Sequence, residues 1–439
     1  MTTHPPTTQV IPCYHGTTAE AWLQQHAHTL PFMTEDDNQQ ATQQQVKALL
    51  KEVQQRGDNA LYDYAQRFGD ALQPHEPIAI SAQTIAEAVA RVAPQTQALL
   101  QEAAHNITQF AQHVMQHLPI EASYTHNEGY RAGFALCPVE SVACYVPAGR
   151  YPLVSSALMT TLTAKAAGVE RVVMLCANPA DEILYVAHLV GVDAVYKIGG
   201  AQALGAVAFG TEQVLATHMV VGPGNRYVNE AKRQLIGSIG IDALAGPSEV
   251  AVLADATANP QWIASDLIAQ AEHDPDARSY LVTPSIELAE AVQVALKEQL
   301  ALLNLPSFVE ESSLKHSAIL VLPTVDACMD AANLLASEHL HLHGSMFIER
   351  QAELRHYGTL FVGDANTVAF GDYMAGPNHT LPTGRASRFS HALSPLSFLR
   401  LQNTLTVLEP NAYLSQYTQP LAQLEQLTAH AYSAQIRRS

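Results

Sequence analysis

The sequence of 439 residues is poor in cysteine and offers no pattern for pairing the few it has. The cysteines are odd in number and far apart, without a C-x-x-C pair or a histidine at zinc-finger spacing. A disulfide framework and a cysteine-rich zinc module are therefore excluded, and we expect reduced thiols that are mostly buried. The five are Cys13, Cys137, Cys144, Cys176 and Cys328.

Basic residues are also scarce, because 23 lysines and arginines stand against 41 acidic residues, giving a formal net charge of -18. Such a charge repels nucleic-acid phosphates and anionic lipid surfaces. No stretch has the roughly 18 uninterrupted apolar residues that a membrane span needs, and the N-terminus lacks the basic start and apolar run of a secretory signal. We expect a soluble, cytoplasmic protein that binds neither nucleic acid nor membrane.

Hydrophobic residues and histidines are plentiful. The hydrophobic fraction of 48% in a chain of this length allows sizeable cores in two or three domains. Twenty histidines are unusual in a chain of which only 15% of residues are charged. This excess can mean metal or proton chemistry, but scattered surface imidazoles are the commoner reason.

The hydrophobic pattern changes along the chain. Residues 1–32 lack clean periodicity and predict an extension that leans on another surface or subunit. Apolar residues recur at helical spacing over 38–68 and 80–118, where Pro94 divides the second block. From about residue 137, β-branched runs such as SVACYVP and RVVMLC alternate with helix-like segments, which predicts parallel β-α-β units and a doubly wound α/β sheet. The segment 383–439 is predicted to be helical again.

Two glycine-rich turns follow predicted strands. MVVGPGN carries Gly222 and Gly224, and KIGGAQALG carries Gly199 and Gly200. Ligand phosphates bind at such strand ends in open α/β sheets. Neither turn completes G-x-G-x-x-G, so a dinucleotide site and a plain strand-to-helix turn remain open. Tyr145, in YVPAGRYP, is a third feature of this kind.

Acids and amides accompany histidines in several stretches. In DLIAQAEHDPD, Gln270 and His273 are three residues apart. This spacing could place both on one helix face, where they share a metal ion. The alternative is a helix C-terminus that ends at Asp274-Pro275. In FGDYMAGPNHTLPTGRA, Asp372 and His379 share a constrained polar loop, which is either a shaped site or a structured turn.

The stretch SEHLHLH places His339, His341 and His343 on one face of a predicted strand and the leucines on the other. A solvated strand face is favoured, and a metal-binding comb is the second interpretation. A third is an acid and base pair made by Glu338 and His339, because both can transfer protons near neutral pH.

These stretches together resemble the histidinol dehydrogenase family. The motifs are ALAGPSEVAVLAD, DLIAQAEHDPD, SEHL, GDYMAGPNHTLPTG and a terminal AH-x-x-S, preceded in order by YVPAG, GGAQA and GPGN. The resemblance runs from about residue 33 to the end. It implies oxidation of L-histidinol through the aldehyde to L-histidine, the last step of histidine biosynthesis, with zinc and two NAD. The alternative is oxidation of another small polar alcohol, such as a sulfopropanediol, by the same mechanism.

The resemblance also implies an architecture of two doubly wound Rossmann-like domains with an incomplete dinucleotide fingerprint, plus small N- and C-terminal helical segments. After the extension 1–32, the segments 33–142 and 249–382 would form the zinc and substrate domain, and 143–248 the NAD-binding domain. The segment 383–439 would reach the partner subunit of a homodimer.

Individual residues acquire roles by match to the family motifs. Glu338 and His339 match its catalytic pair, as water-activating acid and proton-abstracting base, and Ser248 and Glu425 match substrate contacts. The implied NAD contacts are Tyr145, Gln202 and Asn225. The implied zinc ligands are Gln270, His273, Asp372 and His430, the last contributed across the dimer. These four residues and His339 are also implied substrate contacts.

Several positions depart from the family pattern. Ala148 replaces a glycine of YVPGG, and the form Arg150-Tyr151-Pro152 that follows it is typical of divergent relatives. His341 stands where the family motif EHLE has its second glutamate. His341 is therefore the first candidate for a change in substrate, since it lies just after the catalytic pair.

Overall fold

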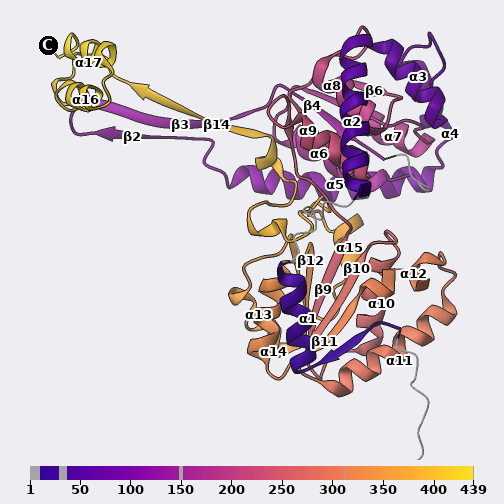
Figure 1. Ribbon diagram of the computed structural model, residues 1–439. Coiled ribbons are helices and arrows are strands. Elements are labelled where there is room, and N and C mark those ends of the chain that lie inside the picture. Colours follow the sequence, from indigo (N-terminus) through magenta and orange to yellow (C-terminus); the bar gives the residue numbers. More distant parts are fainter. Residues whose placement is uncertain (1–9, 29–36, 148–151, 312, 439) are drawn as a thin grey trace, which may run out of the picture.

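Two parallel sheets and a projecting antiparallel arm make up the chain in the computed structural model (Figure 1). The structure describes residues 10–28, 37–147, 152–311 and 313–438. The predicted α/β fold with parallel sheets is confirmed. The departures at Ala148, Arg150 and Tyr151 lie outside the described residues.

The first sheet has five parallel strands in the order β6-β5-β4-β7-β8. After their first residues, Ser141 and Arg171, the central strands β4 and β5 are buried and apolar because helices cover both faces of the sheet. The strands are β4 (Ser141–Tyr145), β5 (Arg171–Leu175), β6 (Ala194–Tyr196), β7 (Met219–Val221) and β8 (Gly240–Ile241). The helices between them are α6 (Val154–Ala166), α7 (Asp181–Val190), α8 (Gly200–Phe209) and α9 (Arg226–Leu235).

The N-terminal helices pack on this five-stranded sheet. They are α2 (Asp37–Arg56), α3 (Asp58–Phe68), α4 (Ala82–Arg91) and α5 (Pro94–Gln116), and Pro94 separates the last two as predicted. Val53 and Leu61 share one core with Val207 and Val220. The segment 33–142 was expected to form one domain with 249–382, but these helices pack on the other sheet. The expected grouping is therefore wrong for them. Helical periodicity identifies an apolar face but not the sheet that covers it.

The second sheet has six parallel strands in the order β1-β11-β10-β9-β12-β13. They are β1 (Cys13–His15), β9 (Glu249–Ala254), β10 (Arg278–Thr283), β11 (Ala318–Val321), β12 (His339–His343) and β13 (Thr359–Val362). Because β1 pairs with β11, the described part of the N-terminal extension leans on its own chain.

Helices cover both faces of the six-stranded sheet. Helices α10 (Pro260–Ala271) and α11 (Ile286–Leu302) share a core with one face, while α1 (Thr17–His28) and α13 (Val325–Leu335) share a core with the other. The shorter helices are α12 (Phe308–Glu311), α14 (Ser345–Ile348) and α15 (Val368–Tyr373). Among the described residues, no helix is long and apolar enough to cross a membrane.

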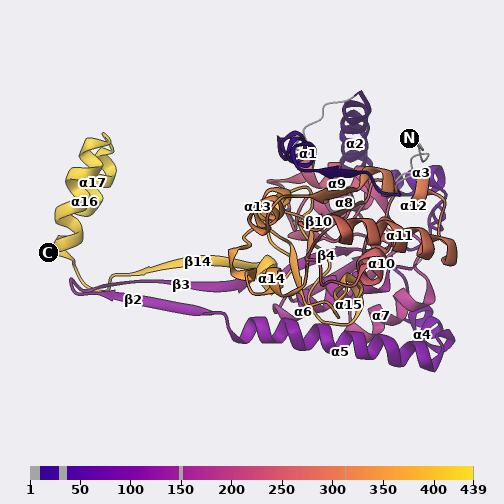
Figure 2. The same ribbon diagram turned by 90° about the horizontal axis from the view of Figure 1, so that it is seen from below.

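A three-stranded antiparallel sheet forms the arm, in the order β14-β3-β2. Its strands are β2 (Glu121–His126), β3 (Tyr130–Pro138) and β14 (Leu399–Thr406), and its far end carries α16 (Ala412–Leu424) and α17 (Thr428–Gln435). Both views show the arm reaching away from the two parallel sheets (Figures 1 and 2). The segment 383–439, predicted to be helical, thus begins with irregular chain and a long strand, because β14 pairs with β3 along its whole length.

Each parallel sheet has a point where the direction of strand addition reverses. In the five-stranded sheet it lies between β4 and β7, and in the six-stranded sheet between β9 and β12. Ligands of open α/β sheets bind beside such points, outside the carboxyl ends of the strands. Tyr145 lies at this end of β4, whereas Glu338 and His339 lie at the amino end of β12.

Candidate active site

Glu338 lies at the amino edge of the six-stranded sheet, directly before β12. The hydroxyl of Ser248, directly before the neighbouring β9, donates a hydrogen bond of 2.5 Å to Glu338 Oε2, and the amide of Glu249 donates one of 3.0 Å to the same oxygen. The pairing of β9 with β12 therefore fixes the position of this carboxyl group.

Burial sets the charge of Glu338. The side chain is 5% exposed, and burial raises its pKa to about 7, although the bonds from Ser248 and Glu249 oppose this rise. The neighbouring carboxyl of Glu249 has a pKa raised to about 7 by burial and by the charge of Glu338. A carboxyl poised near neutral pH can both release and accept a proton. Glu249 had no assigned role in the sequence analysis, and its place in SEVAVLAD gave only a weak signal.

His339 is held as a neutral ring in one tautomer. Its Nδ1 lies 3.2 Å from the backbone carbonyl of Glu249, which can only accept, so Nδ1 carries the proton. Burial lowers the pKa of His339 to about 4, which keeps the ring neutral. Its Nε2 is buried and has no hydrogen-bond partner among the described residues. A lone pair on Nε2 is therefore free to accept a proton.

Three of the four expected zinc ligands approach this pair. Asp372, on α15, lies 3.8 Å through Oδ1 from His339 Nε2 and 3.7 Å through Oδ2 from His273 Nε2. Gln270, near the end of α10, is buried, and neither atom of its amide finds a hydrogen-bond partner in the described part of the chain. Helix α10 ends at Ala271, so His273 stands just beyond it and does not share its face.

These donors fit a zinc ion. Zinc accepts imidazole nitrogen together with carboxylate and carbonyl oxygen. A buried amide without hydrogen bonds is costly unless another group or an ion satisfies it. Gln270, His273 and Asp372 therefore have the chemistry of a metal site that lacks a further ligand.

The loop around His379 joins the site to the five-stranded unit. His379 Nδ1 bonds the backbone carbonyl of Asp372 at 3.0 Å, and its Nε2 lies 3.1 Å from the hydroxyl of Ser156 on α6. Burial lowers the pKa of His379 to about 4, so the ring is neutral. Asn378 adds a bond to the carbonyl of Met159 on the same helix. These hydrogen bonds fix the shape of the loop, and the loop orients Asp372. This corresponds to the first of the two interpretations that the sequence left open.

The residues expected to contact NAD gather at the carboxyl edge of the five-stranded sheet. Tyr145 ends β4, and its hydroxyl accepts a hydrogen bond of 3.1 Å from the amide of Gly200 at the start of α8. Gln202 is buried in the first turn of the same helix. Asn225 caps α9, where its side chain accepts bonds from two backbone amides. The three residues thus stand around the reversal point between β4 and β7.

The turn at Gly222 is held by a buried ion pair. Gly222 has a φ of 116°, which glycine adopts readily and other residues rarely do. A Cβ at this position would lie 2.2 Å from the carbonyl oxygen of Tyr145, so only glycine fits. Lys232 donates to the carbonyl of Gly222 and to Asp242, each at 2.6 Å, and Asp242 in turn accepts the amide of Gly222. Lys232 is 1% exposed. The sequence analysis missed this pair because nothing local marks a buried lysine.

His430 and Glu425 are not part of this site within one chain. Both are exposed at the far end of the arm, on α17 and just after α16 (Figure 2). A single chain therefore brings together Glu338, His339, His273, Asp372 and Ser248, with Gln270 joined to His273 through the backbone, and leaves these two apart.

The favoured interpretation of SEHLHLH as a solvated strand face is wrong. The strand and its alternation are as predicted, since Leu340 and Leu342 enter the opposite core. His341 and His343 are fully buried, however, because α10 packs over their face of the sheet. His341 directs its nitrogens to Asp266 and to the carbonyl of Gly363, so neither is available to a substrate beside Asp372.

Comparisons with known proteins identify the family of this chain. The histidinol dehydrogenase family profile matches residues 33–438. A histidinol dehydrogenase of Gluconobacter oxydans is 40% identical over 397 residues, covering 89% of this chain and 92% of the relative. Histidinol dehydrogenase 1 of a Nostoc species is 41% identical over 400 residues, covering 89% and 91%. The crystal structure of histidinol dehydrogenase from Elizabethkingia anophelis superposes with a TM-score of 0.89 at 30% identity, covering 99% of both chains. The chain belongs to the histidinol dehydrogenase family.

Proposed function

We propose that this protein oxidises L-histidinol through L-histidinaldehyde to L-histidine, with two NAD consumed per substrate. Membership of the family makes it an NAD-dependent oxidoreductase that acts on a CH–OH group. The observation that carries the substrate proposal is the convergence of a neutral imidazole, a carboxyl with a pKa near 7 and three metal-type donors on one sheet edge.

His339 is the proposed base for the alcohol. Its neutral ring presents the lone pair of Nε2 while Nδ1–H is tied to the carbonyl of Glu249. A hydroxyl placed beside Nε2 gives up its proton there as hydride leaves the carbon for nicotinamide. The hydrogen bond to the strand keeps the ring in the tautomer that this step needs.

Glu338 is the proposed base for water in the second oxidation. Addition of water to the aldehyde gives a hydrate, which again has a hydroxyl and a hydride to lose. As a carboxylate, Glu338 accepts the proton of that water. Ser248 and the amide of Glu249 hold its Oε2 in place, so the remaining oxygen is the one available for water.

We infer that Gln270, His273 and Asp372 hold zinc, together with His430 of the partner subunit. A zinc ion bound there would bind the amine and imidazole nitrogens of the substrate and so orient it. The support within this chain is the buried amide of Gln270, which has no hydrogen-bond partner among the described residues, together with the approach of Asp372 to His273, whose backbone amide bonds the carbonyl of Gln270. The position of His430 on an exposed arm supports a homodimer in which each arm reaches the other subunit.

NAD is proposed to bind at the carboxyl edge of the five-stranded sheet. The amino ends of α8 and α9 both point to this edge, and helix N-termini favour phosphate groups. Tyr145, Gln202 and Asn225 surround the same place. The loop of His379 links this unit to the catalytic pair, which is what hydride transfer between the two units requires.

Titration with defined alcohols tests the proposal. Zinc-loaded protein with excess NAD should form about two NADH per L-histidinol, with turnover on the order of 10 per second. The second candidate, a sulfopropanediol, is tried in parallel, because the same base, carboxyl and metal-type donors support oxidation of another small polar alcohol. Negligible turnover with histidinol, together with rapid turnover of the sulfonate, would reverse the assignment.

A further inference from the structure

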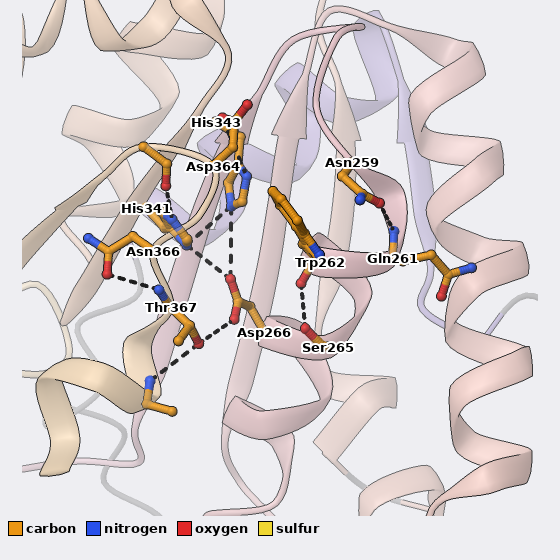
Figure 3. A network of polar contacts seen from close by, with 12 residues as sticks. Asn259, Gln261, Trp262, Ser265, Asp266, His341, His343, Asp364, Asn366 and Thr367 are labelled. Atoms are coloured by element: carbon orange, nitrogen blue, oxygen red, sulfur yellow. Dashed lines mark hydrogen bonds and ion pairs between the residues drawn. The ribbon is translucent and has the colours of Figure 1, made fainter. Parts of the chain in front are cut away.

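A second group of side chains that can bind a metal lies farther along β12 from the catalytic pair. The proposed mechanism does not use this group. Asp266, from α10, meets His341 and His343, from β12 (Figure 3). His341 Nδ1 is 3.0 Å from Asp266 Oδ2, His343 Nε2 is 3.2 Å from His341 Nδ1, and His343 Nε2 is 3.8 Å from Asp266 Oδ2. All three side chains are buried.

The size of this triangle fits a small divalent ion. Zinc bonds of about 2.05 Å place the ligand atoms of a tetrahedron about 3.3 Å apart. The three measured sides scatter around that value. A circle through the three atoms has a radius of about 2.0 Å, so an ion slightly out of their plane reaches all three at a bond length of about 2.1 Å.

The outer nitrogens of both rings face acceptors, as they do in metal-bound histidines. His341 Nε2 lies 3.1 Å from the carbonyl of Gly363, and His343 Nδ1 lies 3.8 Å from Asp364 Oδ1. These acceptors are consecutive residues in the loop after β13. A ligating histidine commonly donates its other N–H to a carboxylate or carbonyl, which directs the lone pair of the inner nitrogen to the metal.

The carboxylate is oriented in the same way. The hydroxyl of Thr367 donates to Asp266 Oδ1 at 2.7 Å, which leaves Oδ2 as the oxygen turned towards both rings. Figure 3 shows Thr367 on one side of Asp266 and the two histidines on the other.

Proton counting favours a cation in this place. His341 carries its proton on Nε2, opposite the carbonyl of Gly363, so a neutral ring turns a lone pair of Nδ1 towards a carboxylate oxygen 3.0 Å away. One N–H from His343 Nε2 can relieve this repulsion. His343 Nδ1 would then be an acceptor, and it is buried without a hydrogen-bond partner in the described chain. With an ion between the inner atoms, the lone pairs of His341 Nδ1, His343 Nε2 and Asp266 Oδ2 all bind the ion, and His343 Nδ1 carries an N–H on the side of Asp364 Oδ1, 3.8 Å away.

The group is separate from the catalytic residues although it shares a strand with them. His341 lies two residues beyond His339, a rise of about 6.6 Å along β12. The ring of Phe361 lies against both, with centroids 5.9 Å from His339 and 6.1 Å from His341. None of the three residues Asp266, His341 and His343 belongs to the set proposed for the catalytic zinc.

We propose that Asp266, His341 and His343 bind a second divalent metal ion of the zinc class, with water in the fourth position. The ion would tie α10 to β12 and, through the outer nitrogens, to the loop of Gly363 and Asp364. The ligand set of two imidazoles and one carboxylate suits zinc or its substitute cobalt. This inference does not depend on the proposed substrate.

Metal counting on the full-length protein tests the site. Chelator-treated protein is reloaded with Zn²⁺, dialysed and analysed for metal per chain, and Co²⁺ is used in parallel for its visible absorption. The variant His341→Gln/His343→Gln should hold one equivalent fewer than the wild-type chain and lose one component of the cobalt spectrum. The matched control is His391→Gln, at an exposed histidine, which should keep the full count.

Two further variants separate the two sites and guard against misfolding. Asp372→Asn removes a proposed catalytic ligand, and this chain should still retain the equivalent that depends on His341 and His343. Asp266→Asn keeps the size of the side chain and an acceptor for Thr367, and it should also lose one equivalent. Equal metal content in the wild-type chain and in folded Asp266→Asn protein would overturn the proposal, and a protonated imidazole paired with Asp266 would then account for the geometry.

Discussion

The hydroxyl of Ser248 donates to the carboxylate of Glu338 from one strand to the next, although the two residues are 90 positions apart in the sequence. The bond depends on the parallel pairing of β9 with β12. It places a carboxyl with a pKa of about 7 beside the neutral ring of His339 at the amino edge of the sheet. Four predictions follow from this site and its supports.

Replacement of Glu338 by glutamine should separate the two oxidations. The amide keeps the acceptor for Ser248 but cannot take a proton from water, so oxidation of the aldehyde should slow by about 10²–10⁴-fold. NADH formation is measured separately from L-histidinol and from L-histidinaldehyde. Equal rates for the variant and the wild-type enzyme on the aldehyde would remove Glu338 from the mechanism.

The same substitution should change how stability depends on pH. Because burial raises the pKa of Glu338 from its ordinary value of 4.5 to about 7, the folded chain holds a proton that the unfolded chain releases between those values. Wild-type stability therefore falls as pH rises through this window. Glu338→Gln lacks the buried charge and should be about 1–3 kcal/mol more stable than the wild-type chain at pH 8, with little difference at pH 4.

Thermal melts of metal-free protein at both pH values measure this difference. Glu310→Gln, at an exposed glutamate on α12, is the control and should follow the wild-type melting curve at each pH. If the melting temperature of Glu338→Gln stays parallel to that of the wild-type chain from pH 4 to pH 8, the raised pKa is wrong.

Mixed subunits should reveal whether the arm completes the partner's site. His273→Ala and His430→Ala chains are each expected to be inactive. In a mixed dimer, one of the two sites has His273 from one chain and His430 from the other, so an equal mixture should regain about a quarter of wild-type activity. Subunit exchange is verified with differently tagged chains. Mixed dimers that form without any activity would count against the shared site.

Loss of the buried ion pair beneath Gly222 should destabilise the five-stranded unit. Asp242→Asn leaves the charge of Lys232 buried without its counter-ion, which typically costs about 3–5 kcal/mol. The KM for NAD should also rise, because the ion pair holds the turn at Gly222. This turn lies against Tyr145 and leads to Asn225, two of the proposed NAD contacts. Denaturant unfolding and steady-state kinetics measure the two effects. Asp326→Asn, at the exposed partner of Arg350, should change stability by less than about 1 kcal/mol.

Much of the local structure was predictable from the sequence. The alternation of β-branched runs with helical segments predicted parallel sheets, and Pro94 divided two helices as expected. The spacing of SEHLHLH predicted a strand with leucines on one face and histidines on the other. These features depend on residues that are neighbours in the chain, and their period of two or 3.6 is present in the sequence itself. Asp372 also lies near His273 and His339, because their motifs lie at the ends of elements that pack together.

The tertiary structure alone decided what covers each face. Periodicity could not show that α2 to α5 pack on the five-stranded sheet, nor that α10 buries His341 and His343. It also could not show that β14 pairs with β3 and carries His430 away from its own chain's site. The sequence by itself determined which residues are apolar, which carry reactive groups and which segments alternate between strand and helix in the parallel sheets. Burial, and with it the pKa of Glu338 and the ligand set around Asp266, depends on surfaces that come from distant parts of the chain, so only the folded structure decided them.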